Sequence, residues 1–164
     1  MADIPSASPL PSTRPSKPLE IEDTSAFEFV KELLAGEPTY AINFHRIQWD
    51  AVKNCYLIIE FLLCDEKQFA KGITPFTSHP NRYFKKNAQK FLSLWRLTQQ
   101  LAAKLYLVNY AKAGTRYADE VLFMEVLSVD ENNPEMPVST RERQYTRAGF
   151  AKMFRELKRR GRYR

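Results

Sequence analysis

Prolines divide this chain into a short N-terminal segment and three long stretches that no proline interrupts. Five of the ten prolines precede residue 20, and the others are Pro38, Pro75, Pro80, Pro134 and Pro137. Because proline breaks the interior of a helix, the stretches 39–74, 81–133 and 138–164 are the parts of the chain that can form long helices. Glycines punctuate the same pattern, as C-cap glycines do, at Gly36, Gly72, Gly114 and Gly161.

This punctuation predicts an all-α fold, a compact bundle of about five helices. The helices are expected at about 25–35, 46–71, 81–113, 116–130 and 139–160, with Ser25–Glu28 and Ser139–Glu142 as capping boxes. Two apolar runs, CYLIIEFLLC and EVLFMEVLSV, also fit strands, since a short apolar run does not distinguish helix from strand. The long flanking helical patterns and the lack of hairpin turn pairs favour helices.

The first 23 residues differ in composition from the rest of the chain. The segment SASPLPSTRPSKP lacks the apolar residues needed for a core, so we expect residues 1–23 to be a disordered Pro/Ser-rich tail or linker. Residues 24–164 then form the helical-bundle domain. Two cysteines make a disulfide framework improbable, and no pattern of a signal peptide or membrane span is visible. A cytoplasmic protein with no membrane partner is expected.

The net charge of +6 is distributed unevenly along the chain. The span 80–116 holds eight basic residues and no acidic one, and residues 137–164 hold ten basic and two acidic residues. An ordinary solvated helix interleaves both signs to gain ion pairs between neighbouring turns. The excess of positive charge therefore favours an anionic partner.

At 100° per residue, both basic helices place their charge opposite an apolar seam. The phosphate-binding residues predicted on the helix at 81–113 are Arg82, Lys85, Lys86, Lys90, Arg96 and Lys104. Those predicted on the helix at 139–160 are Arg141, Arg143, Arg147, Lys152, Arg155, Lys158, Arg159 and Arg160. Two alternatives remain open, a merely solvated basic face and a surface that binds anionic lipid.

No catalytic residue, metal site or cofactor is predicted. His45 and His79 lack a second ligand at metal spacing and fit helix ends or loops, while Cys55 and Cys64 fit core thiols. No phosphate-binding glycine motif or nucleophile motif is present. Three tyrosines fit a core or a subunit interface better than base stacking: Tyr106, Tyr110 and Tyr117. Trp49 and Trp95 fit core anchors.

A basic helical domain of this size without an active site resembles the small subunit of type I CRISPR–Cas effector (Cascade-like) complexes, with the type I-D version the closest match. The linker-like start ADIPSASPLPSTRPSKP fits the form of that subunit made by internal initiation within the large-subunit gene. The resemblance assigns no residue by motif.

This resemblance implies a non-catalytic, sequence-independent nucleic-acid-binding structural subunit in antiviral defence. Its partners would be the guide RNA–target DNA duplex, displaced single-stranded DNA, the large and backbone subunits of the ribonucleoprotein complex, and further copies of itself. The alternatives are a helical protein-interaction adaptor and a phage or plasmid DNA-binding protein.

Overall fold

The computed structural model describes residues 24–161, which fall into two units, 24–41 and 42–161. The first unit contains helix α1, Ser25–Leu34, which confirms the helix predicted there. Its N-cap residue is Thr24 rather than the predicted Ser25, and its C-cap residue is Ala35, whose backbone is left-handed. The predicted disordered tail at 1–23 lies outside the described residues.

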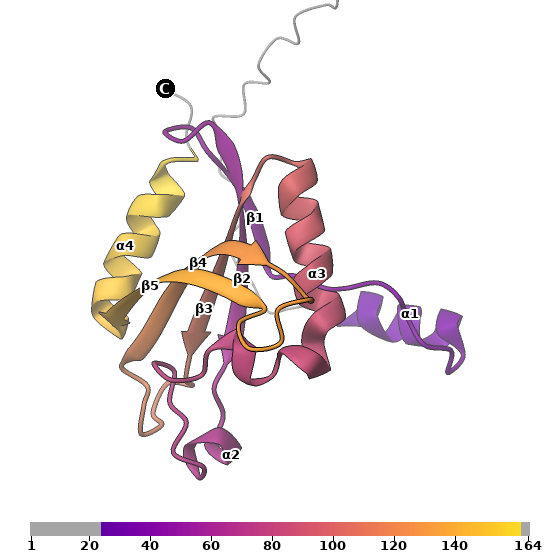
Figure 1. Ribbon diagram of the computed structural model, residues 1–164, viewed down its shortest axis with the longest axis horizontal. Helices are drawn as coiled ribbons and strands as arrows, with labels where there is room; N and C mark the ends of the chain where they lie inside the picture. Colours follow the sequence, from indigo (N-terminus) through magenta and orange to yellow (C-terminus); the bar gives the residue numbers. More distant parts are fainter. Residues whose placement is uncertain (1–23, 162–164) are drawn as a thin grey trace, which may run out of the picture. The chain divides into compact units, whose positions relative to one another are not determined.

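The second unit is built on a five-stranded sheet, so the prediction of an all-α bundle is wrong. Its strands are β1 (Arg46–Asp50), β2 (Cys55–Leu63), β3 (Lys104–Tyr110), β4 (Glu120–Val129) and β5 (Val138–Thr146). Its helices are α2 (Glu66–Phe69), the 3₁₀ helix η1 (Pro80–Arg82), α3 (Phe84–Gln100) and α4 (Arg147–Arg159). Spatial order follows chain order, and every neighbouring pair is antiparallel except β2 and β3, which are parallel (Figure 1).

The helix predicted at 46–71 is instead the β1–β2 hairpin followed by α2. Leu57, Ile58 and Ile59 are consecutive and fully buried, because both faces of β2 are covered. A strand buried on both faces reads as a continuous apolar run, which resembles a buried helix in sequence. The hairpin turn is closed by the carboxylate of Asp50, which accepts two backbone N–H bonds from the turn, and by Asn54 with φ of 51°.

The other predicted helices of this unit also contain strands. The stretch 81–113 contains the end of η1, all of α3 and all of β3, with the left-handed Ala102 (φ of 48°) between the helix and the strand. The stretch 116–130 contains β4 and no helix. The stretch 139–160 contains β5 and α4, and Ser139 lies in the strand, so its predicted capping box is wrong. Helix α4 begins after Thr146, whose Oγ1 accepts a hydrogen bond from Gly149 N at 3.1 Å.

Helices α3 and α4 cover opposite faces of the sheet (Figure 1). Successive side chains of β3 point to opposite faces of the sheet, because side-chain direction alternates along a strand. Leu107 packs in the cluster that contains Phe91 of α3, whereas Val108 packs in the cluster that contains Leu157 of α4. The sheet is therefore the middle of three layers, and each basic helix lies in a different outer layer.

Within residues 24–161, no helix has both the length and the apolar composition that crossing a lipid bilayer requires.

Candidate nucleic-acid interface

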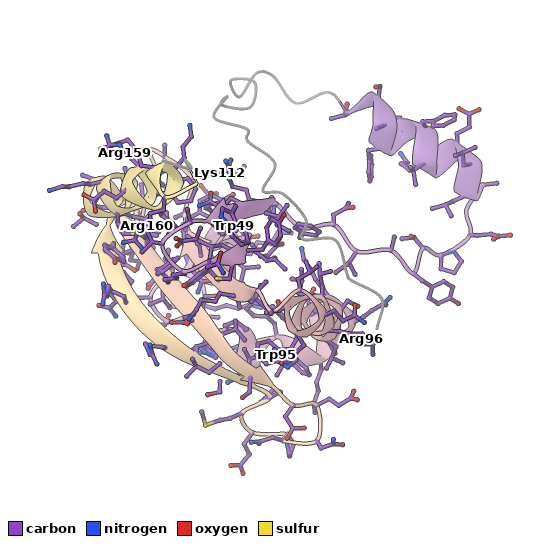
Figure 2. The ribbon with its side chains drawn as sticks, turned by 90° about the horizontal axis from the view of Figure 1, so that it is seen from above. Trp49, Trp95, Arg96, Lys112, Arg159 and Arg160 are labelled. Atoms are coloured by element: carbon purple, nitrogen blue, oxygen red, sulfur yellow. The ribbon has the colours of Figure 1, made fainter. Side chains whose placement is uncertain are left out.

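The two predicted sets of cations do not meet, because α3 and α4 lie on opposite faces of the sheet. Figure 2 shows Arg96 on α3 on one side, and Arg159 and Arg160 at the end of α4 on the other. A single groove on this unit cannot be lined by both helices. We therefore consider the two surfaces separately.

Ion pairs hold two of the phosphate ligands predicted on the helix at 81–113. Lys90 forms an ion pair with Glu60 of β2, whose side chain is 1% exposed. The Glu60 carboxylate also accepts a hydrogen bond from the backbone N–H of His45 at 3.1 Å, and it lies 2.8 Å from His45 Nδ1. Lys104 lies on β3 rather than on a helix and contacts Glu125 at 2.6 Å. That hydrogen bond raises the pKa of Lys104 and lowers the pKa of Glu125.

The cations that remain on the α3 side do not form one helical stripe. They are exposed and comprise Arg82, Lys85, Lys86 and Arg96. Arg82 belongs to η1, and the backbone of Asn87 is non-helical, with φ of −124° and ψ of 16°. The predicted stripe assumed one regular helix through these positions, and this assumption is wrong.

Arg147, a predicted phosphate ligand, holds the start of α4 in place instead. Its Nε donates to the carbonyl of Ala118 at 2.6 Å and its Nη2 donates to the carbonyl of Ala111. Its backbone N–H donates to the carboxylate of Asp119 at 3.0 Å. The guanidinium is therefore engaged with the β3–β4 connection.

The other predicted cations of this region remain exposed on the α4 side of the molecule. We call them the cationic face, which comprises Arg141, Arg143, Lys152, Arg155, Lys158, Arg159 and Arg160. Among the described residues, two of the seven pair with a carboxylate: Arg141 with Glu125 at 3.5 Å, and Arg160 with Asp50 at 3.9 Å. Helix α4 itself carries a single acidic residue, Glu156. The predicted residues Arg141 and Arg143 project from β5, not from a helix.

A cavity of about 260 Å³ opens within the cationic face, between α4, the sheet and the β1–β2 turn. It is lined by Lys53, Tyr106, Phe123, Glu125, Arg141, Glu142, Arg143, Tyr145, Met153, Leu157 and Arg160. Lys53 was missed because the sequence places it inside an expected helix rather than at a turn. Its position after Asp50 and before Asn54, two residues common in turns, is the signal that points to it.

The described residues offer no metal cluster, since no three His, Cys, Asp or Glu side chains among them are placed to share an ion. His79 caps the start of η1, as predicted for a helix end, and its Nε2 lies 3.0 Å from Thr140 Oγ1. Cys55 and Cys64 are free thiols, and burial raises the pKa of Cys64 to about 11. A thiol with so high a pKa is a poor nucleophile.

No protein-family model matches the chain, and comparison with curated proteins and with solved structures finds no significant match. The function is therefore argued from the surface of this unit.

Proposed function

We propose that the chain binds nucleic acid as a polyanion, through the cationic face and without reading base sequence. The observation that carries this proposal is the gathering of seven exposed cations on one side of the unit, five of them without a carboxylate partner among the described residues. The phosphate backbone supplies most of the affinity in binding of this kind. A cytoplasmic location, which the sequence predicts, is part of the proposal.

The chemistry of the face suits phosphate. Most of its members are arginines, whose planar guanidinium donates two parallel hydrogen bonds to phosphate oxygens. Binding to a lipid surface is less well supported, because an interfacial helix must bury its apolar side in the membrane. The apolar side of α4, which includes Phe150, Phe154 and Leu157, is packed against the sheet.

The test compares two double variants with equal losses of charge on opposite faces. Arg155→Gln with Arg159→Gln removes two exposed cations from α4, and Lys85→Gln with Lys86→Gln removes two from α3. Affinity for a duplex is measured against salt concentration. The α4 variant is expected to make the negative slope of log affinity against log salt shallower by about 1.8, whereas the α3 variant leaves the slope nearly unchanged. Equal effects of the two variants, or no binding at low salt, would contradict the proposal.

Membership of a CRISPR effector complex, with its guide duplex, large and backbone subunits and neighbouring copies, stays a prediction. The resemblance behind it assumed an all-helical bundle, and the five-stranded sheet removes that assumption. The cationic face is argued independently of it.

A further inference from the structure

We infer that the cavity beside α4 receives one unpaired nucleotide, so that the chain binds single strands in preference to duplexes. The inference rests on the proposed function for its phosphate contacts and adds a pocket for the base. It concerns the cavity of about 260 Å³ defined above, which opens within the cationic face.

The floor of the cavity suits a flat apolar group. Phe123 of β4 is partly exposed at the cavity and stacks on Tyr106 of β3, which is 3% exposed behind it, with 4.8 Å between centroids and 13° between planes. Tyr145 of β5 lies beside them, its ring centroid 6.5 Å from that of Phe123. Met153 and Leu157 of α4 complete the apolar lining. Nucleobases bind to surfaces of this kind because every base has an apolar aromatic face.

The size of the cavity limits what can enter. Pockets for whole small molecules range from about 300 to 1,000 Å³, and this cavity lies just below that range. It therefore takes a single base or a group of similar size. A duplex must first unpair and unstack a base to fill it, whereas a single strand has unpaired bases available.

Two cations at the cavity are positioned by phenol groups instead of carboxylates. Lys53 Nζ donates to Tyr106 Oη at 2.8 Å, and Arg143 Nη1 contacts Tyr145 Oη at 3.5 Å. A phenol is uncharged at neutral pH, so it orients a cation without neutralising it. Both cations are thus available to the phosphates on either side of an inserted base.

Among the described residues, neither acid at the cavity forms an ion pair with Lys53 or Arg143. Glu125 already contacts Lys104 at 2.6 Å and Arg141 at 3.5 Å. Glu142 lies in the alternate row of β5, where its carboxylate is 3.4 Å from His79 Nε2. The cavity therefore combines an aromatic floor with two cations, Lys53 and Arg143, that have no ion-pair partner among the described residues. Single-strand-binding surfaces use this combination.

The first experiment varies the ligand and uses the full chain. Affinities are measured for an oligothymidine of about 12 nucleotides, for an abasic strand of the same length and charge, and for a duplex. The abasic strand and the duplex are each expected to bind about tenfold more weakly than oligothymidine. Equal affinity for oligothymidine and the abasic strand would overturn the pocket while leaving the proposed function intact. Failure to bind any of the three would overturn the proposed function itself.

The second experiment varies the protein. Met153→Trp fills the cavity without changing charge, and Arg143→Gln removes an exposed cation at the cavity. Met153→Trp is expected to weaken binding of oligothymidine about tenfold and to leave duplex binding unchanged. Arg143→Gln, at an exposed position where folding is not at stake, is expected to weaken oligothymidine binding more than duplex binding. Arg155→Gln is the control that weakens both ligands alike. If Arg143→Gln behaves as Arg155→Gln does, the pocket is contradicted even where Met153→Trp fails to fold.

Discussion

The ammonium group of Lys90 on α3 forms an ion pair with the carboxylate of Glu60 on β2. The Glu60 side chain is 1% exposed, and the Lys90 side chain is 31% exposed. A buried carboxylate without a cation is costly, because the low dielectric of the interior does not solvate it. Lys90, which the charge pattern predicts to bind phosphate, therefore stabilises the buried carboxylate of Glu60 instead.

Lys90→Met is expected to lower the free energy of unfolding by about 3 kcal/mol, because it leaves Glu60 buried without its cation. Urea denaturation measures the change. Lys86→Met, at an exposed position on the same helix, is the control and is expected to change the stability by less than about 0.5 kcal/mol. Adding Glu60→Gln to Lys90→Met is expected to restore stability in part. Similar losses in the Lys86 and Lys90 variants would refute the structural role of the pair.

Some of the fold was predictable from the sequence. Helix α1 was predicted within one residue at its end, and the run 147–159 lay inside a predicted helix. The runs CYLIIEFLLC and EVLFMEVLSV fit either a helix or a strand in sequence, and they contain β2 and β4. Burial on both faces removes the alternation that identifies a strand, so these runs resemble buried helices in sequence. The β1–β2 turn was missed because its signals are Asp50 and Asn54 rather than an Asn-Gly pair.

Arg147→Ala is expected to destabilise the fold by about 1 to 3 kcal/mol, because the carbonyls of Ala111 and Ala118 lose their donors. The same variant is expected to leave the salt slope of nucleic-acid binding unchanged, since the guanidinium is not part of the cationic face. Thermal denaturation and a binding titration against salt provide the two measurements. A shallower salt slope with unchanged stability would instead show that Arg147 contacts phosphate.

The pKa of His79 predicts a pH dependence of stability. Burial lowers it below its ordinary value of 6.5, although nearby Glu142 raises it in part. The unfolded chain then takes up a proton at a higher pH than the folded chain does. The contribution of neutral His79 to stability is thus complete above pH 6.5 and is lost as the pH falls below it. His79→Gln is expected to reduce this slope in urea denaturation measured across that range.

A second group acts at lower pH and provides an internal comparison. The pKa of Glu125 is lowered from 4.5, chiefly by its hydrogen bond with Lys104. The stability that ionised Glu125 contributes to the fold is present above pH 4.5, and it is lost as the pH falls through the lowered pKa. Glu125→Gln is expected to alter only this acidic part of the profile. If His79→Gln alters the acidic part instead, the assignment of the two groups is wrong.

Leu107→Ala tests the centre of the core between α3 and the sheet. Leu107 is fully buried, so its truncation is expected to cost about 3 to 4 kcal/mol through lost burial and a residual cavity. Leu127→Ala, at a site on β4 that is 45% exposed, is the matched control and is expected to cost less than about 1 kcal/mol. Chemical denaturation of both variants checks the difference.

The candidate site was predictable in composition but not in arrangement. Charge counting along the chain found the members of the cationic face, because the excess over acids is visible without a fold. Charge counting does not distinguish these cations from three others that make internal contacts: Lys90, Lys104 and Arg147. Their partners lie on other elements of the fold, so the contacts are not visible in the sequence. Charge counting also gave no reason to place Lys53 beside Tyr106, which are 53 positions apart in the chain.

The end of α4 is tied to the β1–β2 hairpin, where Ala51 N donates to the carbonyl of Arg160 at 2.9 Å and Gln48 Nε2 to that of Leu157 at 3.3 Å. Strands β1 to β4 end by residue 129, so they are synthesised before the helix that covers one face of the sheet. A nascent chain that has not yet reached residue 147 presents Tyr106 and Val108 uncovered. Until α4 emerges from the ribosome, that face is a surface for chaperones or for aggregation.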